Sequence, residues 1–160
     1  MRYIIKSNEI DQMEGLAKTH FLNENAKRMN KSLGDMVGLK NLGFHIIEVE
    51  PGNETTEYHV HFLEDECTSV LSGRATVTID GTDYEVEAGD FIGYPAGGLP
   101  HTMKNTGSEL LRCIVVGQRL PIEGGDYPNL GKRFYRFGDA IDLVDIENVQ
   151  KPGPNVGKKI

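Results

Sequence analysis

Two short polar stretches of the chain contain the residues whose side chains could do chemistry. The first, 51–73, holds His59 and His61, and the second, 89–105, supplies His101. On an extended strand, side chains two positions apart leave the same face, so His59 and His61 are predicted to point the same way. Neutral imidazoles together with a carboxylate suit Mn, Fe, Co, Ni, Cu or Zn, and the order of their affinities leaves the metal's identity open.

A carboxylate for such a site would come from the acidic run Glu64, Asp65 and Glu66, where the apolar pattern breaks and a strand would turn. Side-chain alternation and the six-residue gap between Glu66 and Gly73 favour Glu66 over its two neighbours. An HxH pair alone is common by chance, but three histidines and a glutamate beside tight turns are not expected of plain solvated strands. The combination predicts one transition-metal site per chain.

Short strands must position these residues. The run 44–50 reads as a strand that is apolar enough to be covered on both faces, and the run 74–79 alternates threonine with valine and isoleucine. Asp80 and Gly81 follow it, a pair that tolerates the positive φ of a tight hairpin turn. Closely spaced strands with turn signals and no βαβ alternation predict an all-β, closed or sandwiched fold.

The weakly patterned ends of the chain divide it into three parts. We expect an N-terminal arm at 1–32, a barrel at 33–119, and a C-terminal extension at 120–160 that packs on the barrel or on a partner. The tail 151–160 is rich in proline, glycine and lysine and is predicted to be loosely held. Two further histidines, His20 in the arm and His45 in the first barrel strand, have no adjacent ligand and are interpreted as structural.

These residues and their spacing resemble the two motifs of the cupin superfamily, as found in small single-domain bacterial cupins. The first motif is matched by Gly52, His59, His61, Glu66 and Gly73. The second motif is matched by Gly89, Pro95, Gly97, His101 and Asn105. Each motif departs from the usual spacing by one extra residue before a histidine, and both departures fall in loops.

The resemblance implies a cupin-type double-stranded β-helix, that is, a jelly-roll β-barrel, with the N-terminal arm and C-terminal extension attached to it. It implies a homodimer, and structural roles for Gly73 and Gly97 at turns with positive φ. The metal ligands that it implies are His59, His61, Glu66 and His101.

Other polar residues are candidates for catalysis or substrate binding. Glu57 has the same parity as the two strand histidines and is predicted to point into the barrel mouth as a catalytic base. Tyr94 lies near the second motif and is a candidate proton donor. Basic residues of the second half are candidates to bind a phosphate or carboxylate, because the arginine fork matches such anions. These are Arg112, Arg119, Lys132, Arg133 and Arg136.

Composition narrows the class of protein. The net charge of −7 argues against nucleic acid and anionic membrane surfaces as partners, since both need a basic patch. The N-terminus becomes polar within a few residues, and no apolar run has the length of a membrane span, so a cytoplasmic location is expected. The only cysteines, Cys67 and Cys113, form no CxxC pair and are predicted to be buried small hydrophobic residues.

The fold does not name the reaction, because cupins host many activities. The small acidic chains that this sequence resembles look like sugar-phosphate isomerases, which favours a metal-dependent enzyme acting on a small oxygen-rich metabolite with isomerase-like activity. Two alternatives stay open. One is an iron-dependent dioxygenase that uses the same four ligands, and the other is a non-catalytic cupin that binds or senses a small molecule.

Overall fold

The computed structural model describes residues 2–153 of the 160-residue chain. The N-terminal elements are α1 (Ser7–Asp11), β1 (Leu16–His20), β2 (Asn23–Ser32) and α2 (Leu33–Met36). The next strands are β3 (Leu42–Val49), β4 (Val60–His61), β5 (Glu66–Ser72), β6 (Arg74–Ile79), β7 (Thr82–Glu87), β8 (Phe91–Tyr94), β9 (His101–Lys104) and β10 (Leu111–Gln118). The last elements are β11 (Ile122–Tyr127), the 3₁₀ turn η1 (Pro128–Leu130), β12 (Lys132–Phe137), β13 (Ala140–Asp145) and the 3₁₀ turn η2 (Ile146–Asn148).

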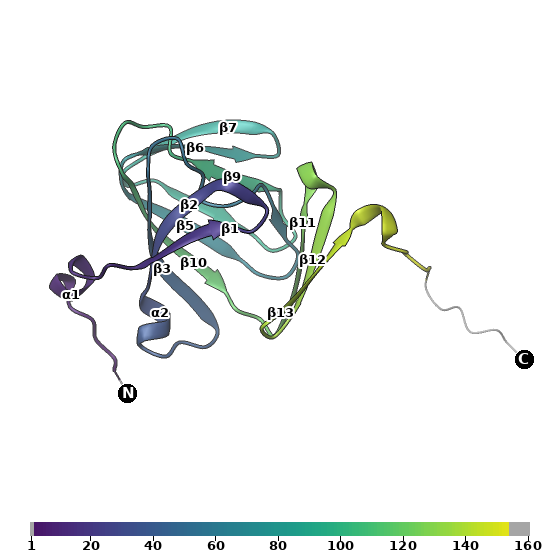
Figure 1. Ribbon diagram of the computed structural model, residues 1–160, viewed down its shortest axis with the longest axis horizontal. Helices are drawn as coiled ribbons and strands as arrows, with labels where there is room; N and C mark the ends of the chain where they lie inside the picture. The colour runs from purple at the N-terminus through teal and green to yellow at the C-terminus, as the bar shows by residue number, and fades with distance from the viewer. Residues whose placement is uncertain (1, 154–160) are drawn as a thin grey trace, which may run out of the picture.

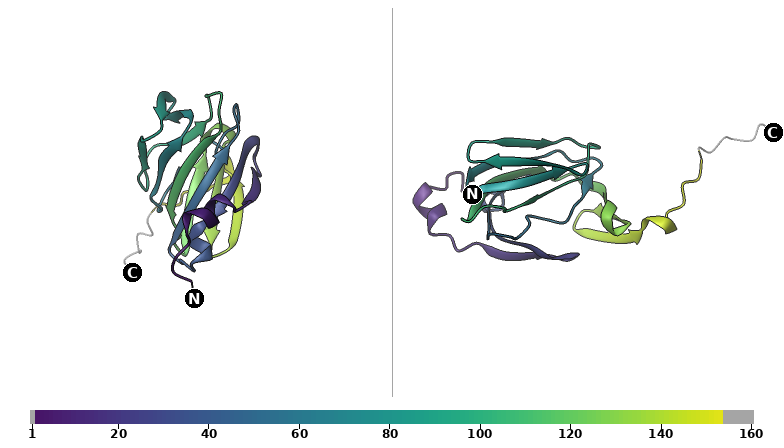
Figure 2. Two further views of the ribbon diagram at one scale, coloured as in Figure 1. Left: turned by 90° about the vertical axis from the view of Figure 1, so that its left-hand side faces the viewer. Right: turned by 90° about the horizontal axis from the view of Figure 1, so that it is seen from above.

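The strands form three antiparallel sheets (Figures 1 and 2), which confirms the all-β prediction. A six-stranded sheet has the order β1-β2-β3-β10-β5-β8, and a three-stranded sheet has the order β7-β6-β9. A four-stranded sheet, β13-β12-β11-β4, joins the C-terminal strands to the first motif. None of the helices within residues 2–153 is long and apolar enough to cross a membrane.

Apolar side chains of the six-stranded and three-stranded sheets form one core. Its buried members are Ile47, Val49, Val70, Ala75, Val77, Ile92, Tyr94, Met103, Leu111 and Cys113. The strand predicted at 44–50 is β3, and both Ile46 and Ile47 are buried there, as expected of a strand covered on both faces. Cys113 is fully buried and Cys67 is half-buried, and both are free thiols.

Turn chemistry shapes the barrel where the sequence predicts it. Asp80 and Gly81 have φ angles of 48° and 74° and join β6 to β7, which confirms the predicted hairpin. Gly73 has a φ of 89°, and a Cβ placed on it would lie 2.9 Å from the carbonyl oxygen of Leu110. Only glycine fits there without strain, because the backbone angle and the close approach both exclude a side chain.

The two end segments are bound to the barrel by strand pairing. Within 1–32, β1 pairs with β2, and β2 pairs with β3 through the register Met29–Ser32 to His45–Glu48. Within 120–160, β11 pairs with β4, so the extension packs directly on the first motif. Residues 154–160 of the tail that was predicted to be loosely held lie outside the described residues.

Candidate metal centre

Backbone pairing brings the two motifs together. His59 and His101 form an antiparallel bridge, in which each backbone N–H donates to the other's carbonyl oxygen over 3.0 and 2.8 Å. Residues that face each other across such a bridge have neighbouring side chains. His61 follows on β4, which is held by β11 through the pair of His61 and Gly125.

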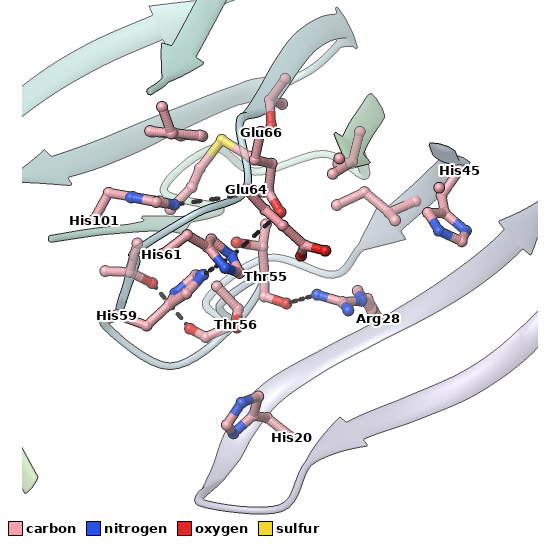
Figure 3. Close-up of a pocket in the computed structure, with 18 of the residues that line it drawn as sticks. His20, Arg28, His45, Thr55, Thr56, His59, His61, Glu64, Glu66 and His101 are labelled. Carbon is pink, nitrogen blue, oxygen red and sulfur yellow. Dashed lines mark hydrogen bonds and ion pairs between the residues drawn. The ribbon is translucent and has the colours of Figure 1, made fainter. Parts of the chain in front are cut away.

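The four predicted ligands meet at one place (Figure 3). The Nε2 atoms of His59 and His61 are 3.1 Å apart. Glu66, at the start of β5, places one carboxylate oxygen 3.9 Å from His61 Nε2 and the other 4.0 Å from His101 Nε2. Side chains from two distant parts of the chain therefore lie near one another, and their convergence on one metal ion stays a prediction.

Hydrogen bonds orient two of these imidazoles toward the common centre. His59 Nδ1 lies 2.8 Å from the carbonyl oxygen of Glu57, and His101 Nδ1 lies 3.3 Å from that of Leu99. Since a carbonyl only accepts, each Nδ1 carries the hydrogen and each Nε2 presents a lone pair. His101 Nε2 is buried and has no hydrogen-bond partner within residues 2–153, which is unusual for a polar atom and is expected of a metal ligand.

Three pairs of these ligand atoms lie close together, at 3.1, 3.9 and 4.0 Å. Among residues 2–153, the group of three whose ligand atoms all lie within 4.8 Å of one another is His61, Glu64 and Glu123. The four predicted ligands would therefore have to move closer together to share one ion. A set of imidazole nitrogens and a carboxylate suits a divalent transition metal.

Burial keeps the imidazoles in the form that binds metal. It lowers the pKa of His101 to about 4 and, with the nearby His61 and His101, lowers the pKa of His59 well below its ordinary value. Both rings are therefore neutral at pH 7, as metal binding requires. Burial raises the pKa of Glu66, while charges on His61 and Arg28 act in the opposite direction.

Tyr94 supports the site through packing. Its ring stacks on His101 with centroids 3.6 Å apart and an angle of 6° between the planes. The side chain is buried, and burial raises the pKa of its hydroxyl, so the group stays protonated at neutral pH. The stack holds the His101 ring in place, and a role for Tyr94 as a proton donor stays a prediction.

The three carboxylates of the acidic run 64–66 have different surroundings in the structure. Glu66 lies near both His61 and His101. The buried Glu64 also lies near His61, but it forms an ion pair with Arg136 and accepts the N–H of Leu120 at 2.5 Å. Asp65 is exposed and accepts the N–H of Ala96. Glu66 is the carboxylate of this run that lies near two of the imidazoles, and its role as the ligand stays a prediction.

A carboxylate that sequence reasoning missed also lies beside His61. One ligand atom each of His61, Glu64 and Glu123 lie within 4.8 Å of one another. Glu123 is 1% exposed, and its Oε1 accepts the N–H groups of Phe62, Leu63 and Gly124 at 3.0, 3.2 and 2.7 Å.

Glu64 and one oxygen of Glu123 are engaged by protein groups, whereas the second oxygen of Glu123 is not. Glu123 Oε2 and His61 Nδ1 are both buried and have no hydrogen-bond partner within residues 2–153. A metal-bound histidine commonly donates its second N–H to a carboxylate. Glu123 and His61 are neighbours that share no hydrogen bond in this structure, so an orienting bond from His61 Nδ1 to Glu123 is a prediction. No local sequence signal marks Glu123, because strand pairing alone brings it there.

Glu57 does not reach the imidazole cluster, which corrects the prediction that it points into the barrel mouth. Its Oε1 accepts the N–H of Tyr58 at 3.0 Å, and its side chain lines a different hollow with Asn23 and Thr102. The backbone from 54 to 59 is not a regular strand, so the two-residue alternation that made Glu57 a candidate base does not hold there.

The cluster lies in the wall of a cavity of about 340 Å³, within the size range of small-molecule sites. His20, Arg28 and His45 also face this cavity (Figure 3). Burial lowers the pKa of His20 and of His45, and positive charge on neighbouring arginines adds to both shifts. The two histidines interpreted as structural therefore line the same space as the predicted ligands.

Comparison with known proteins places the fold. The sequence profile of the family described as Cupin domain matches residues 45–117, which include both motifs. The solved structure of a candidate sugar phosphate isomerase from Acidithiobacillus ferrooxidans is 46% identical, has a TM-score of 0.91, and is matched over 93% of this chain and 96% of that chain. The chain belongs to the cupin superfamily.

Two other relatives are more distant from this cupin. A sugar phosphate isomerase from a cupin superfamily, from Silicibacter pomeroyi, has a TM-score of 0.77 over 92% of this chain and 98% of that chain, and at 22% identity it shows a shared fold only. An uncharacterized protein from Methanocaldococcus jannaschii is 32% identical over 66 residues, 41% of this chain and 52% of that protein. The cupin thus spans about half the length of this curated relative.

Proposed function

We propose that this cupin is a metal-dependent enzyme that isomerises a sugar phosphate. The observation that carries the proposal is the convergence of three imidazoles and one carboxylate on the wall of a cavity of about 340 Å³. The 46% identity to a candidate sugar phosphate isomerase supports the choice of substrate class. One divalent transition metal per chain would be held by His59, His61, Glu66 and His101.

The proposed reaction moves a proton between neighbouring carbon atoms of the sugar. A bound divalent metal polarises a carbonyl or holds adjacent substrate oxygens. The proton needs an acceptor in the cavity that is neither a ligand nor engaged in an ion pair, which excludes Glu66 and Glu64. His20 and His45 remain, and both are neutral near pH 7 because burial lowers their pKa.

The experiment that tests the proposal combines metal analysis with turnover. We expect protein loaded with Mn, Zn or Fe(II) to convert an aldose phosphate to a ketose phosphate, and to lose this activity in EDTA. Glu66→Gln should lose both metal and activity, whereas Asp65→Asn, a change of the adjacent exposed carboxylate, should keep both.

Oxygen uptake separates the main rival function. Consumption of O₂ by the iron-loaded protein, with no interconversion of any sugar phosphate, would replace the isomerase by a dioxygenase. A metal-loaded protein that binds sugar phosphates without converting them would leave a binding module.

A further inference from the structure

The five basic residues that the sequence offered as anion binders are all paired within the protein. The ion pairs are Arg112–Glu48, Arg119–Asp35, Lys132–Asp145, Arg133–Asp126 and Arg136–Glu64. A cation that already contacts a protein carboxylate must give up that contact to bind a substrate anion. None of the five is therefore free to recognise a phosphate without rearrangement.

Arg28 differs from all of them. It lies on β2, faces the cavity that holds the predicted metal ligands, and forms no ion pair with a described carboxylate of residues 2–153. One terminal nitrogen donates to the carbonyl oxygen of Thr55, as Figure 3 shows, while its Nε is buried without a hydrogen-bond partner. Burial lowers the pKa of Arg28 and the charge of Glu66 raises it, but a guanidinium stays protonated in proteins.

Arg28 is half-buried and contacts no described carboxylate, although the charge of Glu66 acts on it from a distance. Such a guanidinium destabilises a protein unless something else offsets the charge. The positive charge of Arg28 also helps to lower the pKa values of His20 and His45. All three groups are therefore close enough to interact electrostatically. An anion with two oxygen atoms would match the fork of Arg28 and would take the free Nε–H. Such an anion would lie in the cavity that the predicted metal ligands also line.

We propose that Arg28 binds the anionic group of the substrate while the sugar oxygens face the imidazole cluster. The identity of that group as the phosphate of a sugar rests on the proposed function, whereas the anion site itself does not. A sugar acid would offer a carboxylate with the same two-oxygen geometry. The N-terminal hairpin of β1 and β2 is then part of the substrate site, because it carries Arg28 into the cavity.

Binding of inorganic phosphate to metal-free protein tests this without any turnover. Once EDTA has removed the metal and has itself been dialysed away, calorimetric titration reports anion binding by the protein alone. We expect Arg28→Gln to weaken phosphate binding by at least about tenfold, the loss expected for hydrogen bonds to a charged group. Arg119→Gln is the matched control, because its guanidinium faces the same cavity but is paired with Asp35, and it should retain wild-type phosphate affinity.

The stability of the same variants gives an independent readout. Without phosphate, Arg28→Gln should unfold at the wild-type temperature or above it, since an unpaired half-buried charge has been removed. Phosphate should raise the melting temperature of the wild type and of Arg119→Gln, but not that of Arg28→Gln. If Arg28→Gln does not fold, Arg28→Lys serves in its place, and its loss of the fork should also weaken binding.

Each outcome decides the proposal. Acetate bound as tightly as phosphate, with the same dependence on Arg28, would identify a carboxylate as the recognised group. Equal phosphate affinity in wild type and Arg28→Gln, or no binding of either anion to the wild type, would overturn it. Failure to find isomerase activity would leave this result unchanged, because the titration uses metal-free protein.

Discussion

Glu123 offers the sharpest test of how the C-terminal extension supports the metal centre. Its Oε1 accepts three backbone N–H groups at the end of β4 and in β11, while its buried Oε2 has no hydrogen-bond partner within residues 2–153. Two substitutions separate these roles. Glu123→Gln keeps an acceptor oxygen for the backbone and loses the charge, whereas Glu123→Ala loses both.

The expected magnitudes follow from the two oxygens. Glu123→Ala removes an acceptor from the N–H of Leu63 and of Gly124, while Phe62 keeps a bond of 2.8 Å to the carbonyl of Gly124. Each N–H left without a partner costs about 1–3 kcal/mol, so Ala should lower the free energy of unfolding by about 2–6 kcal/mol. Glu123→Gln should lower it by about 1 kcal/mol or less, because the backbone bonds remain.

Metal affinity, unlike stability, should fall in Glu123→Gln as well, because this substitution removes the charge. A carboxylate that receives the second N–H of a metal-bound histidine raises its affinity for the metal, and loss of such a partner costs about 10–100-fold. We therefore expect Glu123→Gln to weaken metal binding by about tenfold or more while it stays folded. Competition with a chelator measures the affinity, and urea unfolding of the metal-free protein measures the stability.

Glu147→Gln, a change of an exposed carboxylate on η2 of the same extension, should alter neither quantity. The reasoning is wrong if Glu123→Gln binds metal as tightly as the wild type, because Glu123 would then not act on His61. It is also wrong if Gln destabilises the fold as much as Ala, since the bonds from the backbone would then not be retained.

Three further predictions test the ligands, the pH response and the turns. His101→Gln should reduce the metal content of purified protein from one ion per chain to none, as elemental analysis would show, and equal metal content in the variant would contradict the assignment. The pKa of His101 is lowered from 6.5 to about 4, so the unfolded chain takes up a proton first on acidification, and metal-free protein should lose stability as the pH falls from 6.5 to 4. At about 1.4 kcal/mol for each pH unit between the two values, this histidine accounts for about 3 kcal/mol between pH 7 and pH 4, and His101→Gln should show a correspondingly shallower loss in urea unfolding. Gly73→Ala should destabilise the fold by about 1 kcal/mol or more beyond Gly81→Ala, since both add a Cβ at positive φ but only the first meets backbone atoms, at 2.9 Å, and equal losses in urea unfolding would contradict this.

Much of the fold could be predicted from the sequence, because it depends on local chemistry. Asp80 and Gly81 tolerate a positive φ, which predicts the hairpin turn between β6 and β7. The alternation of residue types on both sides of the turn predicts the two strands. The same alternation, with motif spacing, pointed to His59, His61, Glu66 and His101 as a group, and the structure brings these four side chains together.

The tertiary structure decided which neighbours each of the other residues has. Glu57 lies away from the imidazole cluster because its segment is not a regular strand. The rule that side chains two positions apart share a face holds only for strands, so it does not apply there. Glu123 reaches His61 only because β11 pairs with β4, and Arg28 faces the same cavity only because β2 pairs with β3. Turns and alternation depend on a few adjacent residues, whereas a side chain's partner depends on which strands pair across tens of residues, and a single sequence carries no local signal for that.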